Sequence, residues 1–249
     1  MNNIKEDEIF KAHIKDKHQK CFSKNIQTET GFLDLHQQSI VHEISRDFSV
    51  PFVLFGGYED AQRKKLYFLP DYFDAPANNI CIINAEYKGI SKLSHRDYLG
   101  SVLGLGLKRE KIGDILVFDN NAQLIVESDV ADFIYTNLSK AGKVNLIVSI
   151  LDLSSLKHAE QKTKIINDTV MSLRLDSLVS SAFSCSRSDA VKQISAGNVY
   201  VNDIQTLKPD KAINEGDKLI LRGSGKAYLK SVGNLSRKGR INIQIERYV

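Results

Sequence analysis

The sequence contains few of the residues that mark fibrous, disordered or membrane-spanning chains. Its 249 residues include only 4 prolines and 15 glycines, which excludes a collagen-like or low-complexity chain. No run approaches the roughly 20 consecutive apolar residues that a membrane-spanning helix requires. The first residues alternate acidic, basic and apolar side chains, unlike a signal or transit peptide. We therefore expect a globular cytoplasmic protein that does not span a membrane.

Motifs for metal, cofactor or nucleophile chemistry are also missing. The three cysteines include no Cys-x-x-Cys pair and the six histidines form no His-Glu-x-x-His motif, so neither a disulfide framework nor a zinc site is expected. The turn at Gly104 and Gly106 lacks the third glycine of a dinucleotide-binding fingerprint, and Gly223–Lys226 lacks two residues of a phosphate loop. We expect no cofactor, no metal ion and no catalytic residue.

Positive charge is concentrated in the last third of the chain. The net charge is +4 overall, but residues 1–170 carry −2, whereas residues 171–249 carry +6 because 13 Lys and Arg face only 7 Asp and Glu there. From Arg222 to Arg240 the chain carries six basic residues and no acidic one. An uncompensated basic segment of this kind favours a polyanionic partner.

The N-terminal residues predict a small α/β domain. Apolar residues at helical spacing predict a helix from Ile9 to about Phe48, which Pro51 ends. Short apolar runs at Val53–Phe55 and Leu66–Leu69 predict a pair of strands. Prolines 70 and 76 then favour a boundary, so the first domain is predicted to span residues 1–75.

The next segment, residues 76–155, has the order βαββαβ of a ferredoxin-like domain. The predicted strands are Ile80–Ala85, Ile115–Phe118, Gln123–Val126 and Val144–Leu151, and the predicted helices are Ser94–Leu103 and Asp129–Leu138. The common RNA-recognition module has the same order and stacks bases on aromatic residues of its central strands. Here those strands offer mainly Ile, Val and Cys, with Phe118 alone at an edge, so a structural role is favoured over base stacking.

The last segment contains two predicted helices followed by strands. Residues 156–171 are polar and are assigned to a linker, with a connecting helix or an extended strand left open. An amphipathic helix is predicted at Leu173–Phe183, and Ser186 with Asp189 predicts the capped start of a second helix that ends at Gly197. Strands follow at Val199–Val201 and Lys218–Arg222, so residues 172–249 form the third domain of an α+β protein.

The segment Arg174–Gly223 resembles the S-four RNA-binding domain, named after the fourth protein of the small ribosomal subunit. The residues that carry the resemblance are Arg174-Leu175-Asp176, Ser186-Arg187, Ala190, Ile194, Gly197, Val199, Val201-Asn202 and Gly216-Asp217. The segment Leu93–Val117 resembles the middle domain of YlmH-type proteins, which carry an S-four domain last. This resemblance implies a non-enzymatic factor that binds large-subunit ribosomal RNA in ribosome quality control and contacts subunits carrying peptidyl-tRNA.

The basic residues of the third domain are the candidate RNA ligands. Arg187 lies in the first turn of its helix beside Ser186, where a guanidinium, a hydroxyl and backbone amides can meet a phosphate. Lys192 and Gln193 follow on the same helix, and Arg174 precedes the neighbouring one. Further candidates are Asn202, Lys208, Arg222 and Lys226, extended by Arg237, Lys238 and Arg240.

A second RNA contact is conceivable in the middle domain. Its candidates are His95, Arg96, Lys108, Arg109 and Lys111. The alternative is that the glycines only permit a tight turn and that the bases form local ion pairs with Glu110. The sequence leaves both readings open.

Two other functions remain open at this level. S-four domains also deliver pseudouridine synthases and some RNA methyltransferases to RNA, although here Asp176 belongs to the predicted S-four helix and Gly56-Gly57 is too isolated for a methyltransferase turn. A stand-alone tRNA-binding module is the other alternative. Nothing in the sequence demands self-association, so we expect a monomer.

Overall fold

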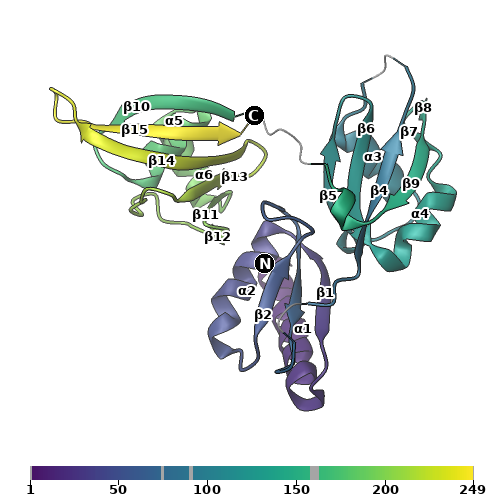
Figure 1. Ribbon diagram of the computed structural model, residues 1–249. Helices are drawn as coiled ribbons and strands as arrows, with labels where there is room; N and C mark the ends of the chain where they lie inside the picture. The colour runs from purple at the N-terminus through teal and green to yellow at the C-terminus, as the bar shows by residue number, and fades with distance from the viewer. Residues whose placement is uncertain (1, 74–75, 90–91, 158–162, 249) are drawn as a thin grey trace. The chain divides into compact units, whose positions relative to one another are not determined.

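The computed structural model describes residues 2–73, 76–89, 92–157 and 163–248. The chain divides into two compact units, Met1–Ala159 and Glu160–Val249 (Figure 1). Helices and strands both contribute to each unit, which confirms the α+β class. Among the described residues, no helix has the length and apolar character needed to cross a membrane.

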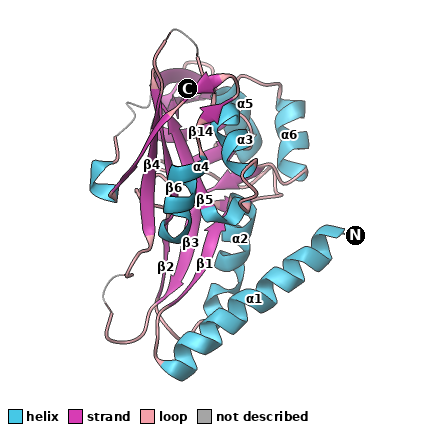
Figure 2. Cartoon of the chain, turned by 90° about the vertical axis from the view of Figure 1, so that its right-hand side faces the viewer, coloured by secondary structure: helices cyan, strands magenta, loops and turns pink. Residues whose placement is uncertain are grey.

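The N-terminal part of the first unit is a three-stranded antiparallel sheet with two helices on one face. The strands β1 (Thr28–Leu33), β2 (Phe52–Phe55) and β3 (Lys64–Phe68) pair in the order β1-β3-β2. The helices α1 (Asn2–Lys24) and α2 (Leu35–Ile44) share one core with that sheet, and Figure 2 shows the long α1 beside α2. A short 3₁₀ turn, Ser45–Asp47, follows α2.

The predicted single helix from Ile9 to Phe48 is wrong in its middle. Asn25 adopts a left-handed backbone conformation with φ of 49° after α1, and β1 then carries two β-branched threonines that favour a strand. Asp34 restarts the helical conformation, because its side chain accepts a hydrogen bond from the Gln37 amide and the Gln37 side chain accepts one from the Asp34 amide. Apolar residues at helical spacing on both sides of Asn25–Asp34 made the segment look like one continuous helix in the sequence.

The middle part confirms the predicted βαββαβ order. The elements are β4 (Ile80–Glu86), α3 (His95–Leu103), β5 (Ile112–Val117), β6 (Asn121–Glu127), α4 (Ala131–Asn137) and β9 (Ile147–Leu151). The four strands form an antiparallel sheet in the order β5-β6-β4-β9, and both helices pack on one face of it. The predicted last strand is divided, because a small hairpin of β7 (Lys140–Ala141) and β8 (Val144–Asn145) precedes β9. Short 3₁₀ turns lie at Arg109–Lys111, Ser128–Val130 and Leu153–Ser155.

The other face of this sheet is covered by the N-terminal part of the chain. Ile125 is fully buried in a cluster with Phe32, and Phe55, Tyr58 and Leu153 pack against that cluster. On the same sheet, the Gln123 side chain donates to the Ser155 carbonyl and accepts from the Lys157 amide. Bases therefore have no access to the positions that an RNA-recognition module uses, which agrees with the structural role predicted for this sheet.

Buried polar groups join the N-terminal and middle parts of the first unit. The Lys65 side chain is 1% exposed and lies 3.2 Å from Glu127 and 3.1 Å from Glu29. The Asp114 carboxylate accepts hydrogen bonds from the Tyr58 hydroxyl and from two backbone amides of the 62–63 segment. The predicted boundary near residue 75 thus lies between two sheets that pack as one unit.

The second unit is a six-stranded antiparallel sheet with α5 (Leu175–Phe183) and α6 (Arg187–Ser195) on one face. Its strands are β10 (Thr163–Val170), β11 (Val199–Val201), β12 (Ile204–Gln205), β13 (Lys218–Leu221), β14 (Gly225–Leu235) and β15 (Ile241–Tyr248). They pair in the order β10-β15-β14-β13-β11-β12. Apolar residues of both helices and of five strands form one continuous core.

Of the two conformations left open for residues 156–171, the extended strand is found over residues 163–170, where the segment belongs to the sheet of the second unit and is no linker. This segment is strand β10, paired with β15 along its whole length from Thr163 opposite Tyr248 to Val170 opposite Ile241. Only Ile166 and Val170 of β10 join the core, so the segment lacks the regular alternation that marks a strand in a sequence. Residues 158–162 of the predicted linker lie outside the described residues.

Candidate nucleic-acid interface

One buried carboxylate organises two arginines at the start of α5 and α6. The Asp176 side chain is 4% exposed. Its two oxygens accept hydrogen bonds from Nε and Nη2 of Arg174, each 3.2 Å long. Nε and Nη2 of Arg187 both donate to Oδ2, at 3.1 and 3.0 Å. Two guanidiniums that are distant in the sequence are thereby held side by side.

The same arrangement controls charge. Burial would raise the pKa of Asp176, but the hydrogen bonds from Arg174 and Arg187 outweigh burial and lower it. The carboxylate is therefore ionised at neutral pH. The Arg174 and Arg187 side chains stay 42% and 57% exposed, and among the described residues neither Nη1 group has a partner. Each guanidinium can thus donate to a phosphate from its free side.

The loop between β12 and β13 packs against the start of α5, beside Arg174 and Asp176. The Leu175 amide donates to the Lys211 carbonyl and the Asp176 amide to the Pro209 carbonyl, so two unpaired amides at the start of α5 are satisfied. Arg174 also forms an isolated β-bridge with Ala212. Lys208 is exposed at the beginning of this loop, and this places a third cation beside the first turn of α5.

Ser186 caps α6 as predicted, but its hydroxyl is engaged in the cap and is not free for a phosphate. Ser186 Oγ accepts from the Asp189 amide at 3.0 Å and lies 2.6 Å from Asp189 Oδ2. That bond to Ser186 lowers the pKa of Asp189, so a negative charge lies at this helix start. Ser186 therefore orients the helix that carries Arg187, and its hydroxyl is engaged within the cap.

Three other predicted ligands have partners within the domain. Lys192 is 77% exposed and lies 3.5 Å from Asp189. Gln193 accepts a hydrogen bond from the Asn198 side chain. Asn202 adopts a left-handed conformation in the β11–β12 turn, where its side chain bonds Asp217 and the Lys218 amide. Lys192 therefore keeps an exposed charge, whereas the amides of Gln193 and Asn202 are engaged within the domain.

The basic residues near the C-terminus divide into two groups. Lys226 is 7% exposed, with its ammonium 4.3 Å from the centre of the Tyr248 ring. The Arg240 guanidinium donates to the carbonyl and hydroxyl oxygens of Thr169, which fastens β10 to the turn before β15. In contrast, Arg222, Arg237 and Lys238 are exposed in turns of the hairpins. The structure thus leaves Lys226 and Arg240 out of the exposed basic surface.

The basic residues of the middle domain mostly bind within the first unit. The Arg109 guanidinium donates to the carbonyls of Ile112 and Gly113, and burial together with nearby Arg63 lowers the pKa of Arg109 to about 10. Lys111 lies 2.6 Å from Glu127 and 2.7 Å from Asp129, and these contacts raise its pKa despite its partial burial.

The remaining three candidates are exposed. Lys108 lies 3.8 Å from Glu110, and desolvation together with Arg109 lowers the pKa of His95. Arg96 is exposed on α3. Of the five candidates, Arg109 and Lys111 are engaged in intramolecular contacts, but their partners are carbonyls, Glu127 and Asp129. Among these five described residues, Lys108 alone has the Glu110 contact that the ion-pair alternative names.

Sequence reasoning missed the role of Asp176. It assigned this residue to an ordinary helix position, although Asp176 lies on the buried side of α5 between Leu175 and Leu178. An acidic residue on an apolar face is rarely tolerated without a cation. That pattern was a usable signal for a buried ion pair, but it did not name Arg187 as the second partner.

Comparisons with known proteins identify the domains and the relatives of this chain. Residues 78–155 match the family model "Putative RNA-binding domain in YlmH", and residues 173–219 match the model "S4 domain". The chain is 34% identical over 222 residues to the "Ribosome-associated protein quality control protein P2" of Bacillus subtilis (strain 168), which covers 88% of this chain and 86% of the relative. A solved structure, "Cell division protein ylmH from Streptococcus pneumoniae", is similar in fold with a TM-score of 0.53 at 21% identity, over 61% of this chain and 95% of that one.

Proposed function

Because the chain belongs to the YlmH family, we propose that it is an RNA-binding factor of ribosome-associated quality control that acts on the large ribosomal subunit. It binds ribosomal RNA of that subunit through the start of α5 and α6 and contacts subunits that still carry peptidyl-tRNA. The family models support RNA binding, and the printed name of the Bacillus relative supports the ribosome quality-control role. This role places the protein in the cytoplasm.

The observation that carries the proposal is the pair of arginines on Asp176. Two guanidiniums with a common carboxylate anchor are preorganised, so binding a phosphate costs little side-chain entropy. Lys208 and Lys192 add exposed positive charge near the two helices. A surface of this kind reads the shape of folded RNA through its backbone.

We also propose that the protein acts by binding and not by catalysis. The acidic residue that an RNA-modifying enzyme would need at this surface is Asp176, whose oxygens already accept four hydrogen bonds from two arginines. A carboxylate in that state is a poor base or nucleophile, because its lone pairs are engaged and its pKa is lowered.

Cosedimentation with separated ribosomal subunits tests the proposed binding. Wild-type protein should pellet with large subunits, more strongly when they carry peptidyl-tRNA, and Arg187→Ala should weaken pelleting about tenfold. The logarithmic salt dependence should also become shallower by about one unit. Arg46→Ala removes the same charge from an exposed site in the first unit and serves as the matched control.

Three results would overturn the proposal. They are equal pelleting of both subunits, undiminished pelleting of Arg187→Ala, and preference for free tRNA over large subunits. A change in the nucleoside composition of the ribosomal RNA after incubation, with or without S-adenosylmethionine, would overturn the binding-only role.

A further inference from the structure

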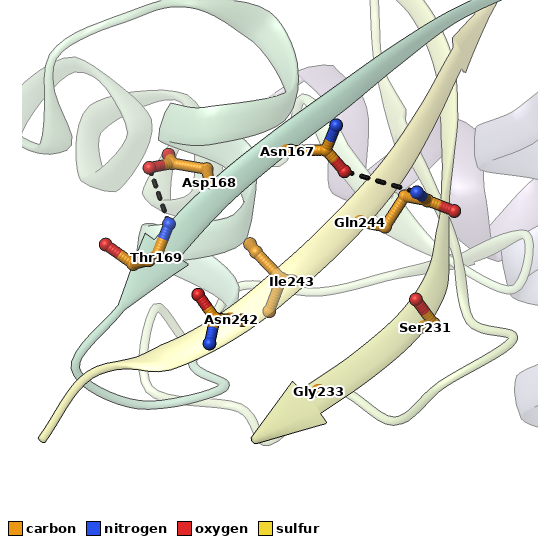
Figure 3. A pocket seen from close by; sticks show the side chains of 8 residues that line it. All are labelled: Asn167, Asp168, Thr169, Ser231, Gly233, Asn242, Ile243 and Gln244. Atoms are coloured by element: carbon orange, nitrogen blue, oxygen red, sulfur yellow. Dashed lines mark hydrogen bonds between the residues drawn. The ribbon is translucent and has the colours of Figure 1, made fainter. Parts of the chain in front are cut away.

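The second unit has an open polar face that the proposed function does not use. Strands β10, β14 and β15 form a depression of about 380 Å³ on the side of the sheet away from α5 and α6 (Figure 3). This volume lies within the range of about 300–1,000 Å³ that is typical of ligand pockets. The residues that line it are Asn167, Asp168, Thr169, Ser231, Gly233, Asn242, Ile243 and Gln244.

Strand alternation places amide side chains on this face. Ile243 and Ile245 of β15 belong to the core, so Asn242 and Gln244, which alternate with them, point to the opposite side. The Gln244 amide nitrogen donates to Asn167 Oδ1 of β10 at 3.2 Å, as Figure 3 shows. Gly233 of β14 contributes no side chain, and this keeps the depression open.

The depression presents both hydrogen-bond donors and acceptors. Among the described residues, Asn167 Nδ2, Gln244 Oε1, Asn242 Oδ1 and the Ser231 hydroxyl have no partner, whereas the Asn242 amide nitrogen donates to the Asn234 carbonyl at 2.5 Å. Asp168, at the edge of the depression, turns its carboxylate toward α5, where it accepts hydrogen bonds from the Ser181 hydroxyl and the Thr169 amide. A phosphodiester accepts hydrogen bonds but donates none, so the acceptor oxygens of this face would stay unmatched against it. The edges of unpaired bases carry donors and acceptors together.

Charge beside the depression selects a nucleic acid over a peptide. The turn from β14 to β15 follows Gly233 and precedes Asn242, and it carries the exposed cations Arg237 and Lys238. Arg240 in the same turn is fastened to Thr169 at the edge of the depression. This turn can therefore hold phosphates while adjoining amides meet the bases.

We propose that this amide-lined face binds an unpaired RNA segment by its base edges, with the backbone held by Arg237 and Lys238. The inference rests on the proposed function for its RNA partner, but it assigns a second contact on the opposite face of the same sheet from Arg174 and Arg187. The second unit then contacts RNA on both sides of its sheet, at the helix starts and at the amide-lined face.

Binding of short single-stranded oligouridylate and oligoadenylate to the full-length protein, measured by fluorescence anisotropy, tests this site. Gly233→Ile fills the depression, and its Cβ would lie 3.4 Å from Asn242 Cβ, an ordinary contact that the strand can accept. The pair Asn242→Asp and Gln244→Glu keeps the shape and adds negative charge. Either change should weaken oligonucleotide binding about tenfold and leave binding to a blunt RNA duplex unchanged. The matched control is Asn120→Asp with Asn137→Asp, which adds the same charge in the first unit.

A photoreactive benzophenone residue at Ser231, in protein bound to large subunits, identifies the occupant directly. Crosslinks to ribosomal RNA or tRNA support the inference, and crosslinks mainly to protein overturn it. Unchanged oligonucleotide affinity in both face variants also overturns it, even if Arg187→Ala still reduces pelleting. If large-subunit pelleting fails while the face variants weaken oligonucleotide binding, the proposed function fails and RNA binding by this face stands.

Discussion

Arginines and lysines of the middle domain and of the last domain look alike in the sequence but have different fates in the fold. Arg109 and Lys111 turn toward carbonyls and carboxylates of their own unit. Arg174 and Arg187 also bind a carboxylate, but they share a single one, and each remains about half exposed. A cationic side chain can bind RNA only through N–H groups that are exposed and not already bonded within the protein. The two regions therefore differ in how many carboxylates and carbonyls each cation contacts, and not in how many cations they carry.

The two sheets differ in the same way. The middle sheet has the topology of an RNA-recognition module, yet Ile82, Gln123 and Ile125 on its second face are fully buried. The second face of the C-terminal sheet exposes Asn242 and Gln244 beside a basic turn. Topology alone would have assigned base stacking to a sheet face that is buried, because accessibility depends on what packs against each face.

The largest effect should come from the most deeply buried cation. Lys65→Met removes a charge that lies between Glu29 and Glu127 and leaves a buried carboxylate with one partner fewer. We expect the free energy of unfolding of the first unit to fall by about 3 kcal/mol. Urea denaturation followed by circular dichroism measures this, since the chain has no tryptophan. Lys108→Met, at a site that is 81% exposed, should change stability by less than about 0.5 kcal/mol. Equal stability of both variants would contradict a structural role for Lys65.

A smaller effect of the same kind should follow from Arg109→Ala. The buried Gly113 loses the side-chain donor of its carbonyl, and the Ile112 carbonyl keeps only the donor from Arg63, which costs about 1–3 kcal/mol of unfolding free energy. Pelleting with large subunits should be unchanged below the melting temperature, the reverse of the result expected for Arg187→Ala. Reduced pelleting with unchanged stability would instead establish a middle-domain RNA contact.

The smallest effect concerns the acid dependence of the second unit. The folded pKa of Asp176 lies below its ordinary value, so its ion pairs contribute stability above about pH 4 that is lost as the pH falls through the folded pKa. Asp176→Asn should therefore be less stable than wild type by about 1 kcal/mol at neutral pH. The difference should shrink below about pH 4. Urea titrations of both proteins at neutral and acidic pH measure it, and a difference that grows on acidification would reverse the assigned sign.

Much of the fold was predictable because its signals are local. The βαββαβ order followed from short apolar runs separated by periodic helices, and the Ser186–Asp189 cap followed from residues three apart. The break at Asn25 and the Asp34–Gln37 capping box were present in the sequence but were masked by helical spacing on both sides. The sequence left strand β10 undecided against a helix because only two of its residues face the core.

The candidate site was predictable in composition but not in geometry. The sequence by itself determined the basic C-terminal third, the S-four motif and the choice of Arg174 and Arg187, since charge and motif are properties of residue type and spacing. Only the tertiary structure decided that Asp176 joins these two arginines, that Lys226 stacks on Tyr248 and that Arg240 fastens β10. Apart from the Arg174–Asp176 contact, these contacts join residues 11 to 71 positions apart in the chain. Such pairing depends on how strands and helices pack, and residue type alone does not carry it.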